Sequence, residues 1–294
     1  MFVPISFKDP VNRFVESLVA EHGDAFHAFS AAFLSALLLP LEQLLRAAPP
    51  ALVLLALAGL AWHATRSLGR SALLVALLYG IGCVGLWDAL MQTLALMTVA
   101  TALTVALGLP LGVLMSRQPR LRALLRPVLD VMQTLPSFVY LIPVLMLFGL
   151  GKVPAILATV IYALPPLVRL TELGIRQVNP EVVEAATSFG SSRWQLLIGV
   201  QLPLARPSIM AGINQTTMMA LAMVVIASMI GARGLGEEVL VGIQTLDSGR
   251  GLQAGIAITI LAIVVDRITQ GYGQSRRQKL SNKDSGITAA EIPS

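Results

Sequence analysis

The stretch Glu184-Ala185-Ala186-Thr187-Ser188-Phe189-Gly190, followed ten residues later by Val200-Gln201-Leu202-Pro203, decides how the rest of the chain must be arranged. It is polar and helix-forming and contains a turn, yet very apolar stretches flank it on both sides. A polar turn cannot lie in hydrocarbon, where every backbone N–H and C=O needs an internal partner. We therefore predict a short helical segment that protrudes into water from a bundle of membrane helices, where another protein can dock.

The composition indicates that lipid is the main solvent of this chain. Of its 294 residues, 55% are hydrophobic and only 13% are charged, and the mean hydropathy is +0.76. A soluble domain carries about 25% charged residues. The formal charge of +5 comes from basic clusters between apolar runs, a distribution typical of membrane topology rather than of nucleic-acid binding. The single cysteine, Cys83, excludes an internal disulfide framework, and residues 1–25 lack the apolar core of a cleavable signal peptide.

Apolar runs along the chain predict an all-α, polytopic membrane protein with about seven transmembrane helices. A spanning helix needs roughly 20 mostly apolar residues. The first two candidates are short, and the stretch 232–250 is expected to be an outer loop. The candidate spans are 49–64, 71–87, 90–116, 127–149, 153–172, 206–231 and 251–270.

The distribution of arginine and lysine orients these spans, because cytoplasmic loops are enriched in both residues. Basic residues gather at 66–70, 117–126 and 169–206, and again after the last span at 276–283. The alternate turns near Asp88 and Lys152 carry few charges. We therefore expect the protruding segment and the C-terminus to be cytoplasmic and the N-terminus to be extracytoplasmic.

The two ends of the chain differ from its middle. Residues 1–48 are expected to form an extracytoplasmic region with an amphipathic helix at 26–46 in the membrane interface, because apolar residues recur there at helical spacing. An eighth span is the alternative, and Pro40 and Glu42 count against it. Residues 49–89 are expected to hold two additional spans before a main domain at 90–270. The polar tail 271–294 is expected to be disordered and cytoplasmic.

The residues needed for catalysis or for ATP binding are missing from the sequence. All three histidines precede the main bundle, no H-E-x-x-H metal site is present, and Gly149-Leu150-Gly151-Lys152 lacks the spacing of a phosphate loop. The carboxylates Asp88, Asp130, Glu172 and Asp266 fall near span ends rather than at mid-membrane, where ion-coupled carriers tend to place them. We therefore predict no catalytic residue, metal or cofactor, and an energy source supplied by a partner.

The protruding segment, residues 173–205, has the signals of helix, sharp turn and helix. Asn179 is suited to the N-cap of the first helix and Pro180 to its first position, and Gly190 can adopt the left-handed conformation that ends it. Phe189 is expected to close the apolar side of this helix. A second helix is expected from Arg193 to Val200, ended by Leu202-Pro203. Ala185 and Ala186 keep one side small enough for a groove in another protein, although an ordinary amphipathic loop stays open as an alternative.

The pattern Glu184-Ala185-Ala186-x3-Gly190-x9-Val200-x-Leu202-Pro203 resembles the cytoplasmic signature of ABC importer permeases. Isoleucine is more usual there at the position of Val200. Residues 90–270 resemble the type I importer transmembrane domain, with five core spans. Further stretches at 85–89, 132–143, 162–171 and 211–216 resemble the permeases for glycine betaine, proline betaine and choline.

This resemblance implies a transport subunit rather than an enzyme, located in the bacterial cell (inner) membrane. Two permease copies, or one copy and a close relative, would line the pathway, two cytoplasmic ATPase subunits would receive the protruding segment, and an extracytoplasmic binding protein would deliver a quaternary-amine osmoprotectant. A secondary, ion-coupled carrier of small zwitterions is the alternative, and a structural or signalling membrane protein is a further one. The residues expected to couple to the ATPase are Glu184, Ala185, Ala186, Gly190, Val200, Leu202 and Pro203.

Candidate pathway residues come from two of the core spans. Asn214, Thr217, Met218 and Ser228 fall along one stripe of the span 206–231, and polar residues in a span usually face protein or a cavity. Helix–helix hydrogen bonding by Asn214 and Thr217, and core packing by Met218, are equally open. In the span 127–149, two prolines interrupt the helix and are expected to bring Gln133, Thr134 and Tyr140 beside the pathway. Tyr140 could offer a cation–π contact to a quaternary ammonium.

Overall fold

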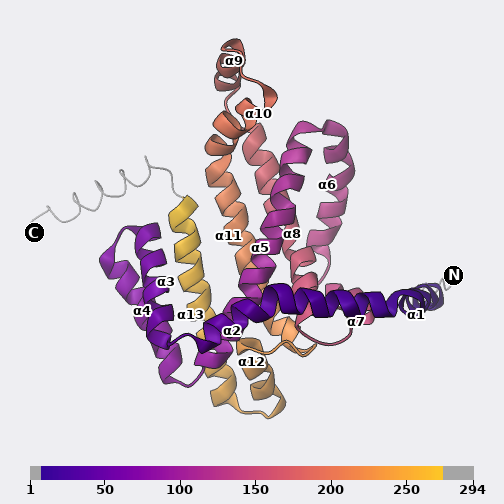
Figure 1. The fold of residues 1–294 in the computed structure, drawn as a ribbon, viewed down its shortest axis with the longest axis vertical. Coiled ribbons are helices and arrows are strands. Elements are labelled where there is room, and N and C mark those ends of the chain that lie inside the picture. Colours follow the sequence, from indigo (N-terminus) through magenta and orange to yellow (C-terminus); the bar gives the residue numbers. More distant parts are fainter. Residues whose placement is uncertain (1–7, 274–294) are drawn as a thin grey trace, which may run out of the picture.

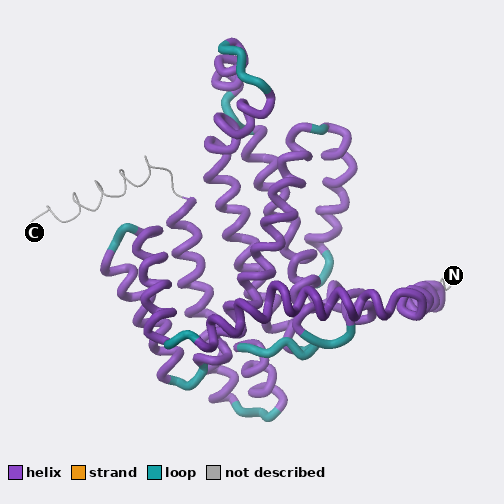
Figure 2. The backbone as a smooth tube through the Cα atoms, viewed as in Figure 1, coloured by secondary structure: helices purple, strands orange, loops and turns teal. Residues whose placement is uncertain are grey.

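The computed structural model describes residues 8–273, and this part of the chain is built of helices without a strand. Short turns join most of the helices (Figure 2). The tail predicted to be disordered lies, from residue 274 onward, outside the described residues. In order, the helices are α1 (Lys8–Phe33), α2 (Leu39–Ala47), α3 (Pro50–Thr65), α4 (Leu68–Cys83), α5 (Trp87–Arg117), α6 (Pro119–Thr134), α7 (Leu141–Phe148), α8 (Lys152–Arg176), α9 (Pro180–Ser188), α10 (Arg193–Leu196), α11 (Leu202–Ser228), α12 (Leu235–Gln244) and α13 (Ser248–Gly273).

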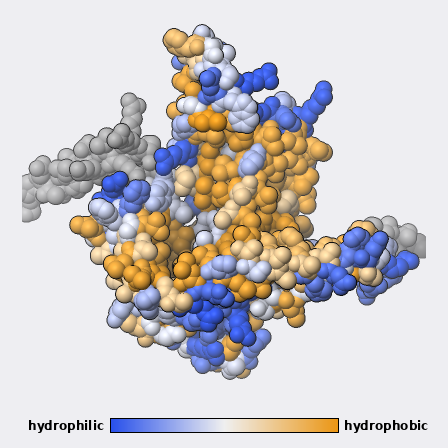
Figure 3. Space-filling model, in the orientation of Figure 1, coloured by the Kyte–Doolittle hydropathy of each residue, from blue (hydrophilic) through white to orange (hydrophobic). Residues whose placement is uncertain are grey.

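The long helices α5, α8 and α11 form the centre of the molecule (Figure 1). Glycines let these helices approach closely: a Cβ at Gly112 of α5 would lie 2.6 Å from the Cβ of Thr171 in α8, and one at Gly212 of α11 would lie 3.2 Å from the Cα of Leu167. Small residues at such contacts are typical of helix packing in membranes, where van der Waals contact replaces the hydrophobic effect as the driving force. A hydrophobic band covers these helices between more hydrophilic ends (Figure 3).

The predicted span 127–149 is not one straight helix. Helix α6 ends at Thr134, a 3₁₀ turn follows at Ser137–Tyr140, and the axis bends by 112° before α7 continues to Phe148. Leu135 has the extended conformation (φ −67°, ψ 135°) that a following proline imposes, and Pro136 precedes the 3₁₀ turn. Pro136, which was expected only to interrupt the span, therefore lies where the chain changes direction.

The predicted count of seven spans is not confirmed. Within residues 8–273, five helices are long and apolar enough to cross a membrane, or six if the bent pair α6–α7 is one span. The spans predicted at 90–116, 153–172, 206–231 and 251–270 correspond to α5, α8, α11 and α13. Helices α3 and α4 have 16 residues each, about 24 Å at 1.5 Å per residue, which is less than the roughly 30 Å hydrocarbon core.

The N-terminal amphipathic helix is longer than predicted. A continuous helical stretch of 40 residues runs from Lys8 to Ala47, through a π-helical turn at Leu34–Leu38. It lies crosswise to α5, α11 and α13 (Figure 1). Phe26 and Phe29 pack against Phe148, with ring centroids 5.2 and 5.8 Å apart. By length and composition this stretch is one of the five candidate spans. Its crosswise orientation favours the interfacial placement over an eighth span, and that placement stays a prediction.

The stretch 232–250, predicted to be an outer loop, contains helix α12. This helix packs against α11 through Gly236, where a Cβ would lie 2.6 Å from the carbonyl oxygen of Val224. At its other end, a Cβ at Gly242 would lie 2.6 Å from the backbone nitrogen of Gly251 at the start of α13. The Thr93 hydroxyl also accepts a 2.8 Å hydrogen bond from the buried N–H of Leu235. The loop is thus a packed element, because its glycines allow close backbone approach.

Candidate functional site

The protruding segment extends beyond the bundle at the end of α8 and α11 opposite to α12 (Figure 1). We call this side of the molecule the α9 end. Figure 3 shows hydrophilic residues around the segment and hydrophobic ones at its outermost point. Within 173–205 the chain therefore leaves the apolar band, as the sequence predicts.

The first helix of the segment begins and ends at the predicted residues. The Asn179 side chain accepts a 2.9 Å hydrogen bond from the backbone N–H of Glu181, and Pro180 occupies the first turn of α9. After Phe189, Gly190 has φ +82°, and a Cβ added to it would meet no atom within 4 Å. The Ser191 N–H then donates to the Ala186 carbonyl at 3.1 Å. A residue other than glycine would strain this turn through its backbone conformation rather than through crowding.

The second helix begins as predicted but does not end at Leu202-Pro203. Ser192 and Gln195 form a reciprocal capping box at its start. The chain then passes through a π-helical turn at Leu197–Gln201 into α11, so that one helix of 36 residues runs from Arg193 to Ser228. Proline has no N–H to donate, and the wider turn, in which the Leu202 N–H bonds the Leu197 carbonyl, accommodates Pro203 without a break.

The outermost surface of the segment is apolar and has no cover within residues 8–273. Phe189 is 92% exposed, Trp194 68% and Ile198 61%. Phe189 therefore does not close the apolar side of its own helix, as predicted, but points away from it. Ala185 is exposed and Ala186 is half-buried. Large apolar side chains held out in water on short, well-capped helices are typical of a site for another protein.

Arg117, at the end of α5, holds the second helix of the segment in place. Its Nη2 donates a 2.8 Å hydrogen bond to the carbonyl oxygen of Arg193, and its guanidinium lies 5.5 Å from the ring centroid of Trp194. From the sequence, Arg117 was expected only to mark the topology. Its position directly after a long apolar run marks it as a helix end, but its contact with Arg193, 76 positions away, depends on the fold.

Glu184 lines a cavity of about 310 Å³ below the segment, together with Arg117 and Arg176. Its side chain is exposed and makes no hydrogen bond or ion pair within residues 8–273. Asn179 already caps α9, so Glu184 is not needed for that purpose. Of the other residues expected to couple, Val200 and Leu202 are half-buried at the π turn, and Pro203 is exposed.

Comparison with known proteins identifies the family. The profile described as "Binding-protein-dependent transport system inner membrane component" matches residues 105–278, more than half of the chain. The chain belongs to this family of importer permeases. It is a transport subunit rather than an enzyme, and in such ABC systems the ATPase is a separate subunit.

Individual relatives agree with this assignment. The permease is 49% identical, over 81% of its own length and 67% of the relative, to the glycine betaine/proline betaine transport system permease protein ProW of Escherichia coli K12. It is 42% identical, over 94% of its length and 97% of the relative, to the glycine betaine transport system permease protein OpuAB of Bacillus subtilis. A solved structure of the inward-facing MetNI methionine ABC transporter has the same fold, with a TM-score of 0.57, 21% identity, and coverage of 64% of this chain and 95% of that one.

The predicted pathway residues of α11 make hydrogen bonds of two kinds. The Asn214 amide donates to Asp266 of α13 at 2.9 Å and accepts from Thr269 of the same helix. Thr217 and Ser228 instead donate to carbonyl groups of their own helix, at 2.7 and 2.6 Å. Met218 packs against the buried cluster around Leu221. Asn214 also lines a cavity of about 400 Å³ with Gln215 and Gln270, so among these four residues it is the one that combines an interhelical bond with open space.

The predicted pathway residues near the bend differ in exposure. Gln133 and Thr134 are exposed at the end of α6, and the Thr134 hydroxyl donates to the Val131 carbonyl at 2.9 Å. Tyr140 is buried, its hydroxyl donates to the Met132 carbonyl, and its ring packs 5.8 Å from that of Tyr162. The structure thus gives Tyr140 a role in holding α6 against the bend. Its role in the pathway stays a prediction.

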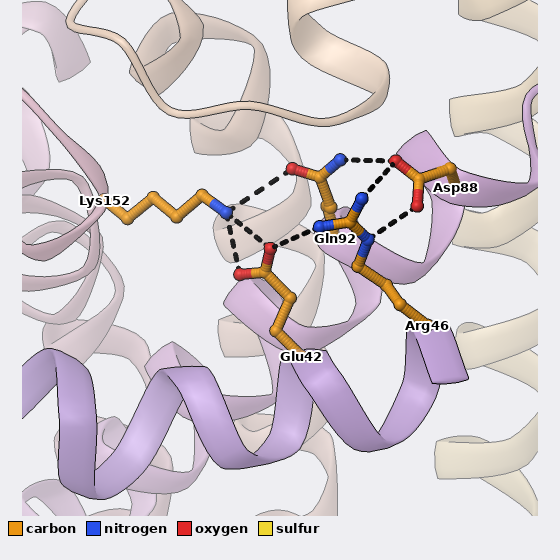
Figure 4. A network of polar contacts seen from close by, with 5 residues as sticks. All are labelled: Glu42, Arg46, Asp88, Gln92 and Lys152. Atoms are coloured by element: carbon orange, nitrogen blue, oxygen red, sulfur yellow. Dashed lines mark hydrogen bonds and ion pairs between the residues drawn. The ribbon is translucent and has the colours of Figure 1, made fainter. Parts of the chain in front are cut away.

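A network of five polar residues lies at the end of the bundle opposite to α9, and no sequence pattern predicted it. Figure 4 shows the five side chains. We call Glu42, Arg46, Asp88, Gln92 and Lys152 the five-residue network. Glu42 is 4% exposed and accepts from the Lys152 ammonium at 2.6 and 2.7 Å. Arg46 pairs with Asp88 at 2.6 Å, and Gln92 links the two pairs, at 2.8 Å to Asp88 and 3.4 Å to Lys152. These contacts join α2 to the starts of α5 and α8.

A second charged cluster was also missed, at the α9 end of α6 and α8. Glu172 is 4% exposed and lies within 4 Å of three guanidinium groups, those of Arg122 (3.6 Å), Arg126 (3.7 Å) and Arg176 (3.1 Å). Asp130 pairs with Arg169 along the same two helices. The basic cluster read only as a topology signal therefore also ties α6 to α8.

Proposed function

We propose that this permease is the membrane-spanning subunit of an ATP-driven importer for a small quaternary-amine osmoprotectant, with glycine betaine or proline betaine as the principal cargo. The observation that carries the proposal is the identity of 49% and 42% to relatives that are named for these compounds. Choline is a weaker candidate, since a relative named for choline is 34% identical over 58% of this chain.

We propose that the protruding segment is where the ATPase docks. Phe189, Trp194 and Ile198 supply an apolar surface for a groove, and the rigid caps at Asn179 and Ser192 hold that surface in place. Glu184, without an ion-pair partner in residues 8–273, is available for a cation on the ATPase. Ala185 and Ala186 allow close approach of the groove, Gly190 permits the turn between the two helices, and Val200, Leu202 and Pro203 carry the segment into α11.

The orientation and the assembly are part of the same proposal. The α9 end is cytoplasmic and the network end is extracytoplasmic, which follows the distribution of basic residues. The permease works as a pair, either with itself or with a close relative, and a binding protein delivers cargo at the network end. Candidate residues for the pathway between the two copies are Gln133, Thr134, Tyr140, Asn214, Thr217, Met218 and Ser228.

Uptake into proteoliposomes tests the cargo and the energy source. The permease is reconstituted with its ATPase and binding protein, and uptake of radiolabelled glycine betaine is followed with and without ATP. We expect uptake that requires ATP, the ATPase and the binding protein together. Uptake driven by an ion gradient in the absence of the ATPase would refute the proposal and favour a secondary carrier.

Two pairs of variants test the docking site. Gly190→Pro cannot adopt φ +82°, whereas Gly190→Asn tolerates the left-handed conformation, so only the first should abolish coupling between ATP hydrolysis and uptake. Phe189→Ser should weaken ATPase binding, because it removes the most exposed apolar side chain of the tip. Leu150→Ser removes a similarly exposed apolar side chain (75%) at the other end and serves as its control. Equal uptake by Gly190→Pro and wild type would show that the ATPase does not dock on the protruding segment.

A further inference from the structure

A groove between α4 and α13, beside the end of α3, has a lining that changes from basic to apolar along its length. It encloses about 530 Å³, and its lining includes Arg70, Leu73, Leu74, Leu77, Ile263 and Arg267. None of these residues belongs to the protruding segment or to the candidate pathway. We call this feature the basic groove.

The arginines and the apolar residues of the basic groove lie at different depths. Arg70 stands in the first turn of α4, and Leu73, Leu74 and Leu77 follow one and two turns later. Arg267 stands near the end of α13, and Ile263 precedes it by one turn. Because the two arginines lie together at one end, the apolar residues of both helices line the part of the groove that continues toward the middle of the membrane.

Contacts beside the groove join α13 to α3, the helix that precedes α4. A Cβ at Gly271 would lie 2.8 Å from the backbone carbonyl of Ala64, so the end of α13 touches the end of α3 directly. The Tyr272 hydroxyl lies 3.0 Å from Nδ1 of His63, and the two rings pack 5.5 Å apart. The groove is therefore formed by packed helices and not by a loop.

Within residues 8–273 the two arginines have no acidic partner. Neither Arg70 nor Arg267 forms an ion pair or a side-chain hydrogen bond within residues 8–273. The neighbouring carboxylate of Asp266 is already bonded by Asn214 at 2.9 Å and by Gln270 at 2.7 Å. The two guanidinium groups, which have no acidic partner in the described part of the chain, lie at one end of an apolar groove. This arrangement favours an anion that carries a long hydrocarbon chain.

We propose that the basic groove binds an anionic phospholipid from the leaflet at the α9 end. The phosphate lies between Arg70 and Arg267, because guanidinium groups bind phosphate oxygens through paired N–H bonds, and basic pockets between membrane helices select anionic headgroups. One acyl chain follows Leu73, Leu77 and Ile263. A soluble phosphate would match the arginines but would leave this apolar wall without a contact. The site is independent of the cargo and of the ATPase.

Native mass spectrometry of the purified full-length permease in detergent tests this site with defined lipids. Phosphatidylglycerol is the anionic probe, phosphatidylcholine is the neutral probe of the same chain length, and glycerol phosphate is the soluble competitor. We expect one tightly retained phosphatidylglycerol per chain, weaker retention of phosphatidylcholine, and no displacement by glycerol phosphate at equal concentration. Displacement by glycerol phosphate would identify a soluble-anion site and overturn the proposal, as would equal retention of the two lipids.

Substitution of the arginines locates the lipid. Arg70→Gln/Arg267→Gln should bind phosphatidylglycerol about 30-fold more weakly (about 2 kcal/mol), since each basic side chain at an anionic surface contributes about 1 kcal/mol. Each single variant should bind about fivefold more weakly, which keeps the test available if the double variant does not fold. Arg120→Gln/Arg206→Gln removes two other exposed arginines from outside the groove and should leave retention unchanged. Wild-type affinity in the groove variants, or an equal loss in the control, would refute the proposal.

Discussion

Breaking the buried ion pair between Glu42 and Lys152 should detach α2 from the bundle. The perturbation is Glu42→Gln, which keeps the size of the side chain and removes its charge. Glu42 has 5% and Lys152 19% of its side chain exposed, so the ammonium would be left poorly hydrated. Its remaining acceptor within residues 8–273 would be Gln92 at 3.4 Å, together with one amide oxygen at position 42.

The expected magnitude follows from that burial. Removing one partner of a buried ion pair costs about 3–5 kcal/mol, because the other charge stays behind without compensation. The residual exposure of Lys152 places this pair at the lower limit, about 3 kcal/mol, which corresponds to an opening equilibrium about 100-fold more favourable. Replacing both partners by Glu42→Gln/Lys152→Met should recover most of the loss, since a matched replacement of a buried pair is often neutral.

Hydrogen exchange measured by mass spectrometry is the assay, because it reports local opening of Leu39–Ala47 separately from the rest of the protein. In Glu42→Gln we expect protection in this stretch to fall about 100-fold while that of α11 is retained. Glu16→Gln, an exposed carboxylate on α1, is the control and should change nothing. The single variant Lys152→Met completes the comparison. If the loss of protection in the double variant equals the sum of the losses in the two single variants, the pair contributes no interaction energy and the reasoning is refuted.

Three packing predictions concern the helices around α5, each measured by thermal unfolding in detergent. Gly112→Leu should destabilise the fold by about 3 kcal/mol, because its side chain would meet Thr171 and the Val168 carbonyl. Gly80→Leu is the control and should be tolerated, because a Cβ there has no atom within 4 Å. Equal stability of the two variants would contradict this prediction. Thr93→Val should cost about 1–3 kcal/mol, because it removes the acceptor for the buried N–H of Leu235; an unchanged melting temperature would mean that another group satisfies this donor. Asn214→Leu should cost about 1 kcal/mol through its lost bonds to α13, and a stabilised variant would disprove a structural role for Asn214.

Local signals were sufficient to predict where the first helix of the protruding segment begins and ends and where its second helix begins, but not that the second helix continues into α11. Asn179, Pro180, Gly190 and Ser192 act through short-range hydrogen bonds and backbone preferences, so their effects are contained in a few neighbouring residues. The long apolar runs likewise predicted α5, α8, α11 and α13. The apolar tip was missed because Phe189 was assigned to the core side of a helix whose neighbours were not known.

Features that depend on distant partners could not be predicted. Glu42 was counted against an eighth span, because a carboxylate is costly in hydrocarbon. Its partner Lys152 lies 110 positions away, and only the fold brings the two together. The 112° bend after α6 depends on how α7 packs, since a proline permits a bend without setting its angle. Helix α12 was assigned to a loop because it falls between two predicted spans. Its packing depends on glycines that make room for the backbones of α11 and α13, two helices whose positions only the fold supplies.

The uninterrupted helix from Arg193 to Ser228 has a mechanical consequence. Its 36 residues make a rod about 54 Å long at 1.5 Å per residue, with the apolar tip at one extremity and the membrane interior at the other. A tilt of about 5° about the far extremity displaces the tip by about 5 Å over that length. The π-helical turn at Leu197–Gln201 lies close to the tip and belongs to the same continuous helix, so no break separates the tip from the membrane interior. With the ATPase docked at the tip, as proposed, a small rotation imposed there would be passed along the helix to the part of α11 inside the bundle.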